Sequence, residues 1–119
     1  MHVKALSIIV APYNFIMVML HEFQWPNTSA SPTEEQMDAD IILLKRGGAN
    51  YVRGAHYPQD PRWLDRLDEA GMVMWCETLG PGVSTKDTQN PEWMTVQEQQ
   101  LNEMLDNALN HPAIMTWGL

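Results

Sequence analysis

Four short strand-like runs, separated by stretches with helical spacing, constrain the fold of this chain more than any other feature. The runs have the length of strands and span residues 15–20, 50–54, 72–75 and 113–117. Strands that alternate with helices through short connections indicate a parallel sheet with right-handed crossovers. The first run, Phe15 to Leu20, is apolar throughout, which is typical of a strand buried on both faces. The sequence therefore predicts an α/β fold with about four parallel strands and three helices.

The first predicted helix begins within the segment from Ser31 to Glu34. Ser31 would form a capping box with Glu34, and Thr33 would form the same box with Gln36, so two starting positions are open. Gly47-Gly48 ends the helix. The apolar face of this helix consists of Met37, Ile41 and Leu44. Its last turn is basic, with Lys45 and Arg46.

Two further helices follow. The second ends at Gly71, and the third covers about Glu92 to Leu109. A long loop from Glu77 to Pro91 precedes the third helix, and its glycines and prolines are expected to prevent regular structure there. The apolar stripe of the second helix is Trp63, Leu64 and Leu67, and that of the third is Val96, Leu101, Leu105 and Leu109.

Two architectures share this order of elements, namely a doubly wound sheet and an eight-stranded barrel. No glycine-rich phosphate fingerprint follows any predicted strand, which weakens the nucleotide-binding version of the doubly wound sheet. Four strands are half of a barrel. The order of the elements alone therefore leaves both architectures open.

Composition narrows the possible partners. Seven basic against fifteen acidic residues give a formal charge of -8, which argues against nucleic acid because phosphate binding needs clustered cations. Cys76 is the single cysteine, so no internal disulfide forms. Lys4 and the apolar residues after it have the shape of a short signal peptide, but Pro12 and Asn14 interrupt the run before membrane-spanning length. A buried strand is the favoured interpretation, and no membrane partner is expected.

Polar side chains recur where the predicted strands end. His21 and Glu22 follow the first strand, Arg53 and His56 end the second, and Glu77 ends the third. The carboxyl ends of barrel strands form one rim, and chemistry collects there. The sequence therefore predicts a pocket at this rim.

The residues around this rim also carry a family resemblance. The run from Asp40 to Pro58, with its Arg53 and its Ala-His-Tyr-Pro segment, resembles the signature region of family 2 glycoside hydrolases, which include β-galactosidases and β-glucuronidases. The segments Pro61 to Glu77 and His111 to Leu119 are similar to the family's next helix and strand and to the strand that runs into its Asn-Glu acid/base motif. Residues 1–19 depart from the family pattern. At the end of the first strand His21 and Glu22 match the family, but its glycine and asparagine are absent from the residues before them.

The resemblance implies a partial (β/α)8 TIM barrel over residues 15–119, preceded by an atypical segment, residues 1–14. It also implies a function. The parent enzyme would hydrolyse β-galactosides or β-glucuronides with retention, and its carbohydrate substrate would contact His21, Arg53, His56 and Glu77. Arg53 would hydrogen-bond the nucleophilic carboxylate, and His56 would hydrogen-bond sugar hydroxyls. The acid/base and nucleophilic glutamates would lie beyond Leu119, so no catalytic residue is assigned here and the isolated chain is expected to be inactive. No cofactor and no metal is expected.

Other interpretations of the same residues stay open. Arg53 could form a structural ion pair with Glu22 or Glu77, and His56 could be an ordinary loop histidine. Glu77 could act as a catalytic carboxylate with Glu22, or could join His21 and His56 at a zinc site, although no tight ligand spacing supports that. Trp75 and Trp117 could stack on a sugar, but core packing is the commoner fate of such residues.

Two further function classes compete with the glycosidase fragment. One is a non-catalytic carbohydrate-binding or assembly module, because the two edges of a half barrel leave backbone groups unpaired and invite self-association or pairing with another chain. The other is a complete small α/β domain with an unrelated activity.

Overall fold

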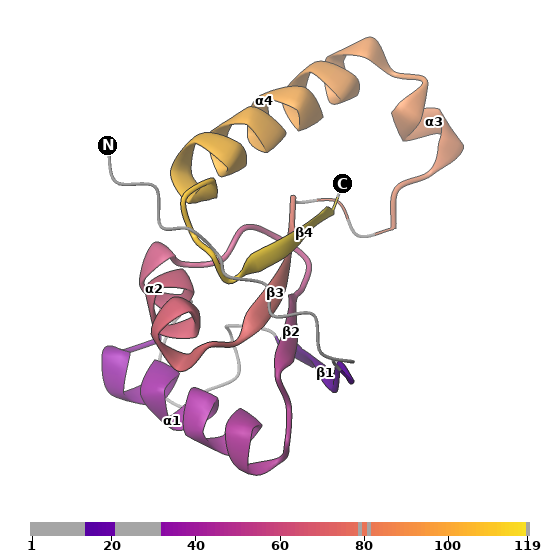
Figure 1. Ribbon diagram of the computed structural model, residues 1–119. Helices are drawn as coiled ribbons and strands as arrows, with labels where there is room; N and C mark the ends of the chain where they lie inside the picture. The colour runs from indigo at the N-terminus through magenta and orange to yellow at the C-terminus, as the bar shows by residue number, and fades with distance from the viewer. Residues whose placement is uncertain (1–13, 21–31, 79, 81, 119) are drawn as a thin grey trace.

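The computed structural model describes residues 14–20, 32–78, 80 and 82–118. Four strands form one parallel sheet in the order β1-β2-β3-β4, with β1 at Met17–Leu20, β2 at Tyr51–Gly54, β3 at Val73–Glu77 and β4 at Ile114–Gly118. The connections contain α1 (Glu34–Arg46), α2 (Pro61–Ala70), α3 (Thr85–Thr88) and α4 (Pro91–Ala108). Figure 1 shows the strands side by side, with α1 and α2 against one face of the sheet. The predicted α/β fold with four parallel strands is confirmed.

The hydrophobic core lies between the helices and the face of the sheet that they cover. Successive side chains of a strand point to opposite faces, so alternate residues of β2 and β3 enter this core. Val52, Met74 and Cys76 are the sheet's buried contributors. The helices contribute Met37 and Ile41 from α1, Trp63, Leu64 and Leu67 from α2, and Met104 and Ala108 from α4. The apolar stripes predicted for the first and second helices are therefore confirmed, with Leu44 partly buried beside them.

A capping box fixes the start of α1. Thr33 is the N-cap, its hydroxyl accepts from the backbone N–H of Gln36, and its own N–H donates to the Gln36 side chain. The second of the two starting positions left open by the sequence is the observed one, while Ser31 lies outside the described residues. Lys45 and Arg46 occupy the last turn as expected, and Gly47 is the C-cap.

Loss of this cap gives a first testable prediction. Thr33→Ala removes one acceptor and leaves the first turn of α1 with an unsatisfied N–H, so the free energy of unfolding should fall by about 1 kcal/mol in urea titrations. Thr85→Ala, at an exposed position in α3, is the matched control and should stay within about 0.5 kcal/mol of wild type. Equal effects of the two substitutions would contradict this account of the cap.

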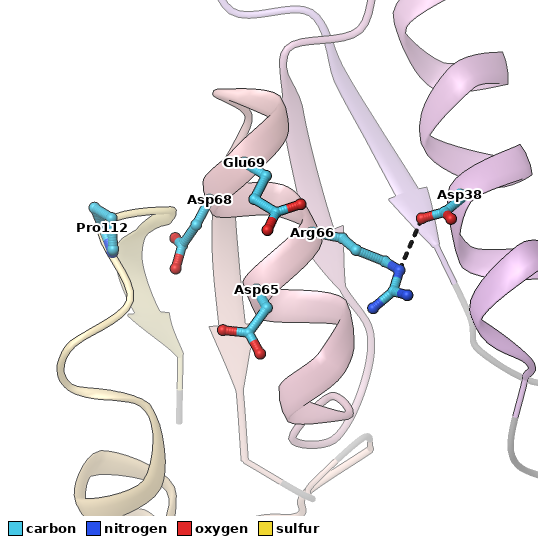
Figure 2. Close-up of a pocket in the computed structure, with 6 residues that line it drawn as sticks. All are labelled: Asp38, Asp65, Arg66, Asp68, Glu69 and Pro112. Carbon is cyan, nitrogen blue, oxygen red and sulfur yellow. Dashed lines mark hydrogen bonds and ion pairs between the residues drawn. The ribbon is translucent and has the colours of Figure 1, made fainter.

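Ion pairs fix α2 against α1. Arg66 of α2 reaches Glu34 and Asp38 of α1, each at 2.8 Å. Figure 2 shows Arg66 pointing across to Asp38, while Asp65 and Asp68 lie on the side of α2 that faces Pro112. Asp68 accepts from the backbone N–H of Ala113 at 2.7 Å and lies 2.8 Å from Nδ1 of His111, which ties α2 to the start of β4.

Three expectations about the elements are wrong. The segment predicted as an unstructured loop contains a one-turn helix, α3, because Ser84 and Asp87 form a capping box there, so the chain has four helices rather than three among its described residues. The stripe predicted for α4 is wrong at Val96 and Leu109, which are exposed, whereas Leu101 packs against the core beside the buried Met104 and Ala108, because only the C-terminal half of α4 reaches the core. The strand predicted as fully buried is exposed. β1 is an edge strand, and Met17 and Met19 are each about half exposed.

No helix among the described residues is both long enough and apolar enough to cross a lipid bilayer.

Candidate substrate-binding rim

Arg53, His56 and Glu77 meet at one end of the sheet. Arg53 is in β2 beside Trp75 of β3, and Glu77 is the last residue of β3, so the parallel register brings their side chains to the same face. Nε of Arg53 donates to Oε1 of Glu77 at 2.6 Å, and Nη2 donates to Oε2 at 3.3 Å. Nδ1 of His56 lies 3.4 Å from Oε2 of the same carboxylate. The structure thus brings together three of the four predicted site residues, and the fourth, His21, lies outside the described residues.

Glu77 holds this group in place. It is only 8% exposed, and a buried carboxylate is stable as an anion only when it is paired. The two-point contact with Arg53 supplies that pairing and fixes the plane of the guanidinium group. The predicted alternative of an ion pair between Arg53 and Glu77 is therefore present, whereas Glu22 lies outside the described residues.

Trp75 is the second support of Arg53. The guanidinium carbon lies 4.8 Å from the centroid of the Trp75 ring, within the range of a cation–π contact. Trp75 points to the sheet face away from the helices, and Trp117 packs at the edge of the core. The two tryptophans therefore differ, with core packing observed for Trp117 and rim packing for Trp75.

Glycine at the end of β4 makes room for this arrangement. Gly118 is paired with Glu77, and a Cβ atom added at Gly118 would lie 2.9 Å from Cγ of Glu77 and in direct collision with Nε1 of Trp75. A side chain here would push both residues out of position. This requirement for close approach was not singled out from the sequence, where Gly118 reads only as the end of a strand.

The rim borders an open cavity of about 300 Å³. Arg53, His56, Trp75 and Glu77 line it together with Thr78 and two glycines of the following loop, Gly80 and Gly82. Its polar surface combines a guanidinium, an imidazole and a carboxylate, which together can donate to and accept from hydroxyl groups. Such a mixed set suits a polyhydroxylated ligand.

Cys76, next to Glu77, takes no part in the rim. Its side chain points to the opposite face of β3, where Sγ lies 3.6 Å from Sδ of Met104. Burial raises the pKa of the Cys76 thiol to about 11, so the thiol is protonated at neutral pH and poorly nucleophilic.

A second polar group lies at the opposite end of the sheet. Asp65, Asp68 and His111 offer ligand atoms within 4.8 Å of one another. In the described part of the chain, they form the group whose side chains lie close enough together to hold a cation. Asp68 is already used by His111 and Ala113, which fits a structural role at the start of β4. Arg66 and Glu69 border the same cleft (Figure 2). The sequence did not bring this group to notice, because His111 lies more than 40 residues after Asp65 and Asp68.

The fold and the rim define the class: a parallel α/β half barrel with its polar site at the carboxyl ends of the strands. The chain belongs to the glycosyl hydrolases of family 2, because residues 14–119 match the TIM barrel domain of that family.

Comparisons with individual proteins agree with the family. A β-galactosidase from Vibrio vulnificus is 35% identical over 91 residues, which are 73% of this chain but 9% of that protein. A family 2 β-galacturonidase from Eisenbergiella tayi superposes with a TM-score of 0.80 at 33% identity, over 86% of this chain and 18% of its own. A β-glucuronidase from Bacteroides uniformis superposes with a TM-score of 0.73 at 34% identity, over 90% and 12%. The chain thus spans less than a fifth of the length of these relatives.

Proposed function

We propose that the chain forms the substrate-binding first half of the catalytic barrel of a retaining β-glycosidase that acts on β-galactosides or β-glucuronides. The observation that carries the proposal is the contact of Arg53 and His56 with one buried carboxylate, Glu77, at the carboxyl-end rim of a family 2 barrel. Relatives named as a β-galactosidase and a β-glucuronidase support the same substrate class.

Within this proposal each rim residue has a separate role. His56 hydrogen-bonds hydroxyl groups of the sugar, and this contact strengthens as the oxocarbenium-like transition state forms. Arg53 presents its remaining N–H groups to the nucleophilic carboxylate of the parent enzyme and favours its ionised form. Glu77 is a positioning residue, because its pairing with Arg53 and its burial suit a support better than a nucleophile. His21 is a further sugar-binding candidate on the resemblance alone.

The 119-residue chain by itself is expected to be inactive. Retaining glycosidases need two carboxyl groups about 5 to 5.5 Å apart, one as nucleophile and one as acid/base. The resemblance assigns the acid/base glutamate to a position a few residues after Leu119, at the end of β4, and the nucleophile to a later barrel strand. The purified chain should therefore show no turnover of aryl β-galactosides or aryl β-glucuronides above a buffer blank. Turnover that is abolished by His56→Ala would overturn this prediction.

A hybrid barrel tests the function itself. Residues 14–119 would replace the matching segment of the Vibrio vulnificus β-galactosidase, which supplies the rest of the barrel. The folded hybrid is expected to hydrolyse an aryl β-galactoside or an aryl β-glucuronide. The sugar that it prefers shows which substrate specificity residues 14–119 support. A hybrid that folds and assembles like the Vibrio enzyme, but hydrolyses neither substrate, would count against the proposal.

Exposed apolar residues favour a second candidate, a non-catalytic assembly fragment. Phe15, Ile16 and Met17 are each about half exposed at the β1 edge, and Met115 is similarly exposed on β4 at the other edge. Edges with unpaired backbone groups and apolar side chains pair readily with another chain. Sedimentation of the isolated chain as a dimer would support this candidate, and a stable monomer at high concentration would contradict it.

A further inference from the structure

The indole of Trp75 leaves a buried hydrogen-bond donor unpaired. Nε1 of Trp75 is buried and has no acceptor among the described residues. Gly118 of β4 lies against this nitrogen, since a Cβ atom added there would collide with it. An unpaired buried N–H lowers stability, and such departures from the rules of folding are expected at functional sites. Trp75 is therefore a costly residue for a purely structural position.

The face of the same ring supports Arg53. Arg53 and Trp75 are register partners on β2 and β3, so both side chains leave the sheet on the same face. The guanidinium carbon of Arg53 lies 4.8 Å from the centroid of the ring. With Gly118 at the edge of the indole and Arg53 over its face, the ring is wedged between β2 and β4 and gives the guanidinium group a floor.

The contacts of Arg53 leave one end of its guanidinium group free. A guanidinium group carries five N–H donors in a planar fork. Glu77 accepts from Nε and from Nη2, and no described residue accepts from Nη1. The free end therefore consists of Nη1 and Nη2, a pair that matches a carboxylate in two-point contact. The Arg53 side chain is 30% exposed and lines the open rim cavity, so a group in that cavity can reach this end.

The tilt of the guanidinium plane decides how well this free end acts on a carboxylate. A two-point contact needs both N–H groups to point at the two oxygen atoms, and electrostatic attraction falls with distance. Glu77 fixes one edge of the guanidinium group, but the plane can still tilt about that edge. The ring of Trp75 blocks this tilt on the side where it lies.

We propose that Trp75 is a positioning residue of the β-glycosidase: it holds the plane of Arg53 so that the free Nη1–Nη2 end faces the nucleophilic carboxylate of the complete barrel. This inference rests on the proposed function, because that carboxylate belongs to the parent enzyme. Trp75 acts through Arg53 and not on the sugar itself.

The isolated chain tests the contact between Trp75 and Arg53. In the isotopically labelled 119-residue chain, Trp75→Leu should speed the hydrogen exchange of the Arg53 Nε–H about fivefold, the effect of one lost cation–π contact, measured by NMR. Trp93→Leu, at a half-buried tryptophan of α4 outside the rim cavity, is the matched control and should leave this exchange unchanged. Equal exchange in the two variants would show that Trp75 does not hold the guanidinium group, which would overturn the proposal.

The pH dependence of the hybrid barrel tests the role in catalysis. A cation lowers the pKa of a nearby carboxyl group, so a guanidinium group that turns away lets the pKa of the nucleophile rise. The acidic limb of the kcat/KM profile reports this group in the free enzyme. Trp75→Leu should therefore move the acidic limb to higher pH by about one unit, and Trp93→Leu should not move it. A merely structural defect would lower kcat/KM equally at every pH and leave the limb in place.

Trp75→Phe is the conservative variant. It keeps an aromatic face under Arg53 and removes the unpaired N–H, so it should fold at least as readily as Trp75→Leu. Its acidic limb should move by about half as much, because Phe offers a weaker cation–π contact than Trp. If Trp75→Leu does not fold in the hybrid, the limb of Trp75→Phe decides the question.

The outcomes separate this inference from the proposed function. A folded hybrid with Trp75 intact that hydrolyses neither substrate contradicts the proposed function, and the role of Trp75 falls with it. An active hybrid whose acidic limb stays in place in the Trp75 variants leaves the proposed function intact and overturns the role of Trp75 alone.

Discussion

Glu77→Ala is expected to lower the free energy of unfolding of the chain by about 2 to 3 kcal/mol. The substitution removes the carboxylate that pairs with Arg53 at 2.6 Å and lies 3.4 Å from His56, and it leaves a partly buried guanidinium group without its main partner. Breaking a buried pair costs about 3 to 5 kcal/mol. The loss expected for Glu77→Ala is smaller than this range because solvent screens the pair, since the Arg53 side chain is 30% exposed. Denaturant unfolding measures the loss directly.

Two variants separate the charge of Glu77 from its shape. Glu77→Gln keeps an acceptor oxygen and the side-chain volume, so it should cost less than Glu77→Ala. Glu98→Ala, at an exposed position on α4, should change stability by no more than about 0.5 kcal/mol. If Glu77→Ala proved as mild as Glu98→Ala, the carboxylate would not hold the rim together and the assigned role of Glu77 would be wrong.

The second large effect concerns catalysis in the hybrid barrel. His56→Ala should lower kcat for the preferred aryl β-glycoside about 100-fold, which corresponds to about 2.7 kcal/mol of transition-state stabilisation. KM should change much less, because the contact of His56 with the sugar is proposed to strengthen mainly in the transition state. Steady-state kinetics over a range of substrate concentrations separate the two constants.

The controls for His56 test whether the effect is local. His56→Asn keeps a hydrogen-bonding group and should recover part of the lost rate. Arg46→Ala, at an exposed residue in the last turn of α1, should leave both constants unchanged. Unchanged kcat in the His56→Ala hybrid would remove His56 from the site.

Much of the fold was predictable because it depends on local signals. The spacing of Met37 and Ile41, the capping residues and the glycine stops are each written in a few consecutive residues, and the observed elements follow them. The parallel order of the strands followed from their alternation with helices. The position of Arg53 and Glu77 at one end of the sheet followed in turn, because parallel strands place their carboxyl ends together.

The failures have a common physical cause. An apolar run predicts that a strand prefers burial, but it does not specify what covers the strand, and β1 is therefore an exposed edge here. Likewise, the apolar positions of α4 do not reveal that Met104 and Ala108 are its buried residues while Val96 and Leu109 stay exposed. The close approach at Gly118 and the group at Asp68 and His111 depend on pairs of residues far apart in the sequence, and no local pattern reports such contacts.

The central claim is that the side chains at this rim contact the sugar of a β-glycosidase. The most direct test is a crystal structure of the hybrid barrel with the product of its preferred substrate bound. The account predicts a ring nitrogen of His56 within about 2.6 to 3.2 Å of a sugar hydroxyl, and Arg53 still paired with Glu77 beneath it. A sugar that binds elsewhere in the hybrid, with neither His56 nor Arg53 beside it, would contradict the account.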